Sequence, residues 1–150
     1  MPEVGGAEPP PATNTQYTTI MNILTLSIKQ KFFDEILSGK KTQEFREIRP
    51  TNSSKYMLYE LNGKKYADAD QIPDEEGDLN VEPIKYDAIK FLTGAYTGKR
   101  PYALVEVKDA NIEFFCDEEG NDITYEYNGE TYVAAQIVYD LGRVIEKSEY

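Results

Sequence analysis

The chain has 150 residues, 40% of them apolar and 29% charged, which is ordinary for a single globular domain with a sizeable core. Its formal net charge of -11 opposes non-specific binding to long nucleic acid, because such binding depends on neutralising phosphates. One cysteine and no histidine exclude an internal disulfide, nearly exclude the usual zinc sites, and remove the commonest general base.

Residues 1–20 are rich in proline and small residues, which predicts a disordered N-terminal extension. They have neither the basic start nor the apolar stretch of a signal peptide, and no apolar run approaches the roughly 18 residues of a membrane span. We therefore predict one domain over residues 21–150, with no membrane association, metal or cofactor. The lone Cys116 is typical of a reducing compartment, so we expect a cytoplasmic monomer in which this thiol is packed.

Residues 22–28 alternate two sets of side chains, a pattern that predicts a strand buried on at least one face. Ser27 and Gln30 have the spacing of a capping box, which indicates that a helix follows. The apolar face of this helix is formed by residues at helical spacing, Phe33, Ile36 and Leu37. Gly39 suits the left-handed position that ends a helix.

Residues 42–48 predict the second strand. Later strands are predicted by alternation and by their β-branched and aromatic residues, over residues 56–60, 64–67, 86–93, 102–108, 112–116, 123–127, 133–139 and 143–147. One helix and these strands predict an α+β domain, built as a small mixed β-barrel.

The connections between these strands also carry signals. Asn62-Gly63 and Asn128-Gly129 are strong hairpin signals. Residues 67–82 are acidic and predict a surface loop, and residues 140–142 predict a bend or bulge within the last strand region.

Charge is distributed unevenly along the chain. Residues 27–49 carry six bases and four acids, and residues 85–100 carry four bases and one acid. Residues 60–82 carry eight acids and two bases, and residues 106–130 carry nine acids and one base. The segment after the helix is therefore locally basic, so a small anionic or polar ligand can bind there while the remaining surface repels polyanions.

The residues after the helix form a candidate site. Gly39 allows a sharp turn and a close approach of a ligand to the backbone. Lys41 can hydrogen-bond a carbonyl or phosphate group or, if buried, act as a base. Glu44 can accept a hydrogen bond from an exocyclic amine, and Arg46 offers a planar fork for phosphate, carboxylate or a base edge.

This segment resembles the ASCH domain, a branch of the PUA-like superfamily. The family hallmark is Gly, any residue, Lys, any two residues, Glu, any residue, Arg, which Gly39, Lys41, Glu44 and Arg46 supply at that spacing. The resemblance covers about residues 22–49. It implies a PUA-like β-barrel with one main helix across a cleft, and a ligand that is a nucleoside, a nucleotide or a short RNA.

Some small ASCH proteins are amidohydrolases that deacylate N4-acetylcytidine, so the resemblance also implies a possible catalytic role for Lys41. That subgroup has a threonine at the position of Glu44, and a glutamate on a later segment that has no identified counterpart here. Hydrolysis is therefore the alternative to a binding function. A further alternative is an acidic protein-interaction module, in which residues 117–119 bind a basic partner.

A base bound in such a cleft would stack on aromatic side chains. The candidates are Phe45, Tyr96 and Tyr102, the last two flanking a loop in which Arg100 can also contact a ligand. Two structural alternatives stay open. Gly39 can serve only as a helix cap, and Glu44 and Arg46 can form an ion pair with no role beyond stability.

The motif also makes a geometric prediction. Along a regular strand, Lys40 shares a face with Glu44 and Arg46, and Lys41 lies on the opposite face. The motif groups Lys41 with Glu44 and Arg46 instead. Both hold only if residues 39–42 still form the turn out of the helix and the regular strand begins near Gln43.

Overall fold

The computed structural model describes residues 21–95 and 98–150, so the predicted extension over residues 1–20 lies outside the described residues. The described elements are, in chain order, β1 (Ile23–Ser27), α2 (Gln30–Ser38), β2 (Gln43–Ile48), α3 (Ser53–Tyr56), β3 (Met57–Leu61), β4 (Lys64–Tyr66), the 3-10 turn η1 (Ala69–Gln71), β5 (Leu79–Pro83), β6 (Ala88–Leu92), β7 (Tyr102–Phe114), β8 (Thr124–Tyr127), β9 (Glu130–Val133) and β10 (Ala135–Lys147).

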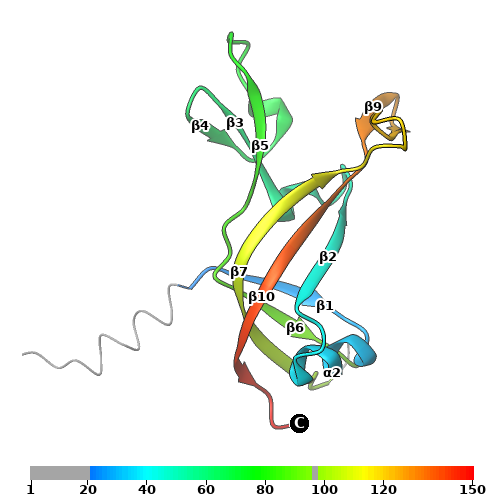
Figure 1. Cartoon of the computed structure of the whole chain (residues 1–150). Helices are drawn as coiled ribbons and strands as arrows, with labels where there is room; N and C mark the ends of the chain where they lie inside the picture. The colour runs from blue at the N-terminus through cyan, green and yellow to red at the C-terminus, as the bar shows by residue number, and fades with distance from the viewer. Residues whose placement is uncertain (1–20, 96–97) are drawn as a thin grey trace, which may run out of the picture.

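The main sheet has five strands in the order β1-β6-β7-β10-β2, and it curls into a half-barrel (Figure 1). β1 pairs with β6 in parallel, whereas β6–β7, β7–β10 and β10–β2 are antiparallel. The predicted mixed β architecture is thus confirmed in its coarse form, as a curled sheet that α2 accompanies at one end.

The core lies on the inner face of this sheet, because alternate residues of each strand are apolar and point to the same side. The largest fully buried hydrophobic side chains come from β1, β6, β7 and β10, namely Leu26, Phe91, Ile89, Val105, Ile137 and Tyr139. The amphipathic α2 adds Phe33 and Ile36 to the same core. The predicted apolar face of the helix is therefore the face that packs.

β7 and β10 are the longest strands, with 13 residues each. The two strands predicted over residues 102–108 and 112–116 are one continuous strand as far as Phe114. The predicted bend at residues 140–142 is confirmed as register shifts in β10, between Asp140 and Leu141 and again before Val144. Such irregularities strengthen the local twist and help the sheet to curl.

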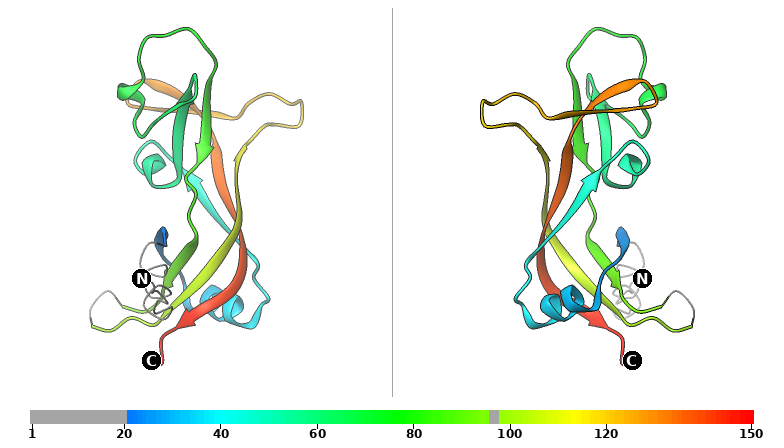
Figure 2. Two further views of the ribbon diagram at one scale, coloured as in Figure 1. Left: turned by 90° about the vertical axis from the view of Figure 1, so that its left-hand side faces the viewer. Right: turned by 90° about the vertical axis from the view of Figure 1, so that its right-hand side faces the viewer.

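Two smaller sheets lie at the end of the molecule away from α2 (Figure 2). One has the order β4-β3-β5 and the other is the hairpin β8-β9. Both predicted hairpin turns are confirmed, with positive φ at Asn62 (52°) and Gly63 (84°) and at Asn128 (50°) and Gly129 (81°).

Three further sequence-based predictions are wrong in detail. The predicted loop over residues 67–82 contains η1 and most of β5, which pairs with β3. The predicted capping box is absent, since Lys29 is the N-cap residue of α2 and makes no side-chain capping hydrogen bond. Cys116 is exposed rather than packed, because it lies beyond the end of β7, where it forms an isolated antiparallel β-bridge with Asp122.

Among the described helices, none has the length and apolar character needed to cross a membrane.

Candidate functional site

The turn between α2 and β2 places Lys41. Gly39 has a φ of 83° and donates its N–H to the Ile36 carbonyl at 3.2 Å, which ends the helix as predicted. The Lys41 N–H then bonds the Glu35 carbonyl at 3.0 Å. Regular pairing of β2 begins only at Gln43, so Lys41 still belongs to the turn. The predicted geometry of this segment is confirmed.

Glu44 lies at the centre of the site. Glu44 is only 5% exposed, because its side chain lies on the inner face of the sheet beside the buried Tyr139 of β10. Its Oε1 is 3.1 Å from Lys41 Nζ, and its Oε2 accepts a hydrogen bond from Arg46 Nε at 2.5 Å. One carboxylate is therefore paired with two cations, and their attraction offsets the cost of burying its charge.

Arg46 also connects β2 to the end of β1. Its Nη2 donates to the Ser27 carbonyl at 2.9 Å. Arg100 approaches the same residue from the β6–β7 connection and donates to Ser27 Oγ at 3.2 Å. Two of the predicted site residues, Arg46 and Arg100, thus meet at Ser27, although they are far apart in the sequence.

A small open pocket of about 310 Å³, which we call the Lys41 pocket, lies beside Arg46, whereas Gly39 and Arg100 are not among its lining residues. It is lined by residues from the end of β1, the start of α2 and the turn into β2, namely Ser27, Ile28, Lys29, Phe32, Lys41, Glu44, Phe45 and Arg46. Phe32 and Phe45 are both exposed, and Lys41 Nζ lies 5.6 Å and 6.0 Å from their ring centroids. The ammonium group is therefore flanked by two aromatic rings.

The Lys41 pocket is basic although the protein is acidic. Its lining includes three cations, from Lys29, Lys41 and Arg46, and one carboxylate, from Glu44. Burial raises the pKa of the nearby Tyr56 hydroxyl above its ordinary value, an effect that Arg46 opposes and Glu44 adds to. With three cations and one carboxylate, the lining of the pocket carries a net positive charge.

Other predicted candidates lie elsewhere. Tyr102 does not line the pocket, since its ring packs under Lys90 Nζ at 4.7 Å and its hydroxyl donates to Glu146. The Lys40 side chain is 77% exposed, and its Nζ lies 3.8 Å from the Glu35 carboxylate, outside the pocket lining. Tyr96 lies outside the described residues.

Phe32 and Lys29 line the pocket but were not predicted as site residues. Phe32 adjoins Phe33 but is 38% exposed, so it lies at the margin of the buried face that Phe33 and Ile36 occupy. An aromatic residue at this margin, next to a charged motif, is the signal that identifies Phe32. Lys29 has no comparable signal, because an exposed lysine before a helix is common.

Among the lining residues Glu44 is the only carboxylate, and both of its oxygens already contact cations. The second glutamate that the amidohydrolase subgroup uses therefore has no counterpart in this lining, and hydrolysis stays a prediction. In the described part of the chain, no group of three carboxylate or thiol side chains is arranged to hold a metal ion.

Comparisons with models of known protein families, with curated proteins and with solved structures found no match to this chain.

Proposed function

We propose that this chain is an ASCH-type, PUA-like module that binds a nucleoside, a nucleotide or a short RNA in the Lys41 pocket. The observation that carries the proposal is the grouping of Lys41, Glu44 and Arg46 with two exposed phenylalanine rings around one opening. The succession of a strand, a helix that ends in glycine and a charged strand supports the assignment to this family.

Each group has a matching part of a nucleotide. Phe32 and Phe45 offer faces on which a base can stack, as aromatic side chains do in RNA-binding modules. Each oxygen of Glu44 has further lone pairs, so the carboxylate can still accept from an exocyclic amine. Lys29, Lys41 and Arg46 are the donors for phosphate or carbonyl oxygens.

Size and charge favour a small ligand. A volume of about 310 Å³ lies at the lower end of the range for ligand pockets, roughly 300–1,000 Å³. The positive lining contrasts with the net charge of -11, which repels a long polyanion once it extends beyond the pocket. We therefore expect a mononucleotide or a few nucleotides of RNA to bind, with no gain in affinity for a longer RNA.

Calorimetric titration with the four nucleoside monophosphates and with RNAs of increasing length tests this proposal. We expect Lys41→Ala to weaken the tightest ligand about tenfold, since it removes a charge-assisted hydrogen bond and a cation that faces the ligand. Phe32→Ala should weaken it by a similar factor, because stacking of a base on an aromatic ring is worth about 1–3 kcal/mol.

Lys40→Ala is the matched control, because it removes the same charge from the adjacent residue, whose side chain points to solvent. It should change the affinity less than about twofold, as expected for a screened surface charge. Equal affinity in wild type and in the Lys41 and Phe32 variants would exclude this pocket as the binding site. Affinity that rises steadily with RNA length would contradict the assignment of a small ligand.

A further inference from the structure

Among the described strands, only β10 pairs with the upper half of β7. β6 pairs with Tyr102–Glu106 of β7, and among the described residues the last backbone hydrogen bond on that side is from the Val107 N–H to the Asp87 carbonyl at 3.0 Å. In the described part of the chain, the strand pairing of residues 108–114 is with β10 alone. Figure 1 shows β5 diverging from β7 above this point, and most of residues 108–114 are exposed. We call residues 108–114 the open edge of β7.

The direction of the backbone groups follows from one hydrogen bond. Phe115 donates its N–H to the Ala134 carbonyl, toward the side of β10. Because backbone groups alternate along an antiparallel strand, Ile112 and Phe114 direct theirs to the open side. Ala110 does the same, and its N–H is bonded by the Asp109 carboxylate at 2.9 Å. The open edge therefore presents backbone groups that a further strand can pair with.

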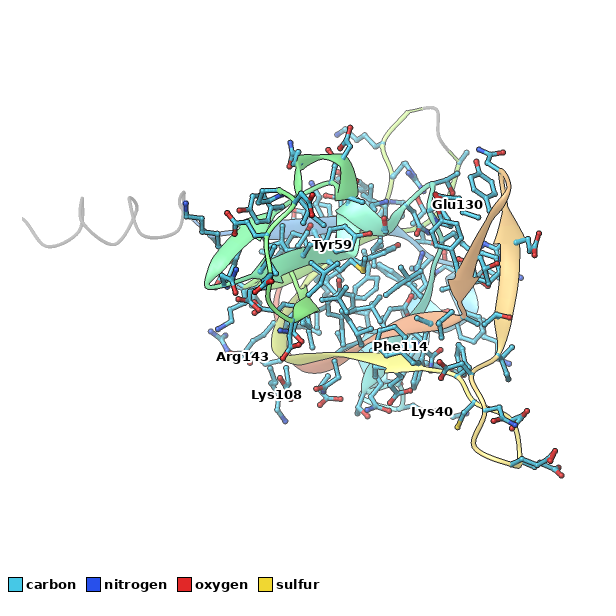
Figure 3. The ribbon with its side chains drawn as sticks, turned by 90° about the horizontal axis from the view of Figure 1, so that it is seen from above. Lys40, Tyr59, Lys108, Phe114, Glu130 and Arg143 are labelled. Carbon is cyan, nitrogen blue, oxygen red and sulfur yellow. The ribbon has the colours of Figure 1, made fainter. Side chains whose placement is uncertain are left out.

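The inner face beside this edge is apolar. Ala110, Ile112 and Phe114 are opposite Tyr139, Ile137 and Ala135 of β10, so they share the inner face of the half-barrel. Phe114 is nevertheless 54% exposed, and Figure 3 shows it beside the packed side chains while Lys108 lies on the outer side. At the other end of the edge is a second hollow of about 500 Å³, whose lining includes Ile84, Tyr86, Val107 and Ala110.

The outer face beside the edge is acidic. Asp109 and Glu113 alternate with the apolar residues and point outward. Residues 109–122 as a whole contain six carboxylates and no lysine or arginine. None of these six forms an ion pair with another of the described residues. The acidic charge at this edge is therefore not neutralised within the described part of the chain.

We propose that the open edge of β7 binds an extended peptide segment of another protein, in which apolar side chains alternate with lysine or arginine. Main-chain hydrogen bonds to Ile112 and Phe114 would hold the peptide as an added strand. Its apolar side chains lie beside the same two residues on the inner face, and its basic side chains lie beside Asp109 and Glu113 on the outer face. Cross-strand neighbours of this kind set both the register and the alternation of the partner.

The probe is a ten-residue peptide of alternating lysine and valine. Its control is the same peptide methylated on every second backbone nitrogen, which removes the main-chain donors that would pair with the edge. Binding is measured by fluorescence anisotropy, and the strand contact by hydrogen exchange of individual amides. We expect the first peptide to bind and to slow exchange at Ile112 and Phe114. The methylated peptide should bind at least about tenfold more weakly, since it lacks main-chain donors.

Two pairs of variants separate the edge from general charge and hydrophobicity. Glu113→Lys should weaken the peptide about tenfold, whereas Glu126→Lys, the same change on the exposed face of β8, should have less than about a twofold effect. Phe114→Ala should weaken it several-fold, whereas Leu79→Ala, which truncates a residue of similar exposure on β5 (52% against 54%), should not. All four changes are at exposed positions, and circular dichroism confirms that each variant is folded.

The proposal is overturned by absence of binding, by binding that leaves the Ile112 and Phe114 amides unprotected, or by equal loss in Glu113→Lys and Glu126→Lys. Protection of those amides by a short RNA and not by the peptide would also overturn it and assign the edge to nucleic acid. Lys41→Ala should leave peptide binding unchanged, so the outcome is independent of the function of the Lys41 pocket.

Discussion

Glu44 is the residue on which the Lys41 pocket is built, because its carboxylate holds Lys41 and Arg46 in place. Removing a partner from a fully buried ion pair costs roughly 3–5 kcal/mol. Here the two cations keep 18% and 26% of their side-chain exposure, so water replaces part of the lost interaction. We therefore expect Glu44→Gln to lower the free energy of unfolding by about 2 kcal/mol, measured by urea denaturation.

Glu47→Gln is the control for this change, since it lies on the same strand with its side chain 65% exposed and is paired with Arg49 at 3.4 Å. It should cost less than about 0.5 kcal/mol, as expected for a surface pair. Equal costs at the two positions would mean that the ion pairs of Glu44 contribute no more than surface charges do.

The hydroxyls of Tyr139 and Tyr86 differ in whether they have a hydrogen-bond partner among the described residues. Tyr139 is fully buried, and its hydroxyl has no hydrogen-bond partner among the described residues. The Tyr86 hydroxyl donates to the Lys55 carbonyl at 2.7 Å. We expect Tyr139→Phe to be neutral or to stabilise the fold by about 1 kcal/mol, because it removes an unsatisfied buried group. Tyr86→Phe should destabilise it by about 1 kcal/mol.

Thermal and urea unfolding of the two variants measures these differences. Both changes remove a single oxygen atom, so each serves as the control for the other. A clear loss of stability in Tyr139→Phe would show that this hydroxyl has a partner, such as a buried water molecule.

At the residue scale, the sequence predicted Lys41, Glu44 and Arg46 as a group, because the motif fixes their spacing and the glycine fixes the turn. It did not predict the contact of Arg46 with Ser27 or the approach of Arg100, because these depend on how β1, β2 and the β6–β7 connection meet in space. Long-range pairing of this kind leaves no local pattern in a single sequence.

At the scale of elements, α2 shows how local signals succeed and fail. Its end was predicted because Gly39 has a conformation that other residues adopt only with strain. Its start was not, because Ser27 still belongs to β1 and its carbonyl accepts from Arg46. β5 was hidden by an acidic sequence typical of loops, and its pairing with β3 overrides that tendency.

Gly39→Ala tests whether this glycine is needed only as a cap. A Cβ atom at Gly39 meets no other atom within 4 Å, so the cost comes from the backbone conformation alone. We expect a loss of about 1 kcal/mol in the free energy of unfolding, and a smaller loss for Gly39→Asn, since asparagine tolerates the left-handed region better.

Ligand titration of the same two variants separates the two roles of Gly39. Unchanged nucleotide affinity in the folded Gly39→Ala protein assigns it to capping alone. A loss of affinity larger in Gly39→Asn than in Gly39→Ala, the reverse of the order in stability, would indicate that a ligand approaches the backbone there.

At the scale of the whole molecule, the half-barrel encloses a group of tyrosines whose ionisation opposes folding. Burial raises the pKa of Tyr56, Tyr86 and Tyr139 above the ordinary value of 10.0. The folded state thus keeps these hydroxyls protonated at a pH at which the unfolded chain releases their protons. Their contribution to stability is complete below pH 10 and is lost as the pH rises above it.

We therefore expect the free energy of unfolding to be flat with respect to these groups up to about pH 9 and to fall steeply above about pH 10. Urea denaturation at a series of pH values measures it, with tyrosinate absorbance as the direct readout of ionisation. Tyr139→Phe should reduce the steepness of the fall. Tyrosines that all ionise at their ordinary pKa while the protein stays folded would contradict this prediction.

The architecture of the whole domain was also predictable only as far as its local signals allow. Alternation and turn residues were enough to predict a mixed β domain with two hairpins, since each signal is local. The order of strands in the main sheet and the separate sheet β4-β3-β5 were not predicted. They follow from which apolar faces fit together, and nothing in the alternation of one strand specifies its neighbour.

The bond from Arg46 to the Ser27 carbonyl has a mechanical consequence. β1 and β2 are the two edge strands of the main sheet and do not pair with each other, so this bond connects the two edges of the half-barrel. The Lys41 pocket is lined by side chains from the end of β1 and from β2, and a ligand bound there would connect these two strands. At a concentration one hundred times its Kd, such a ligand adds about 2.7 kcal/mol to the stability of the folded state. The fraction of pockets that hold ligand and the fraction of molecules in which β1 and β2 separate would then report the same equilibrium.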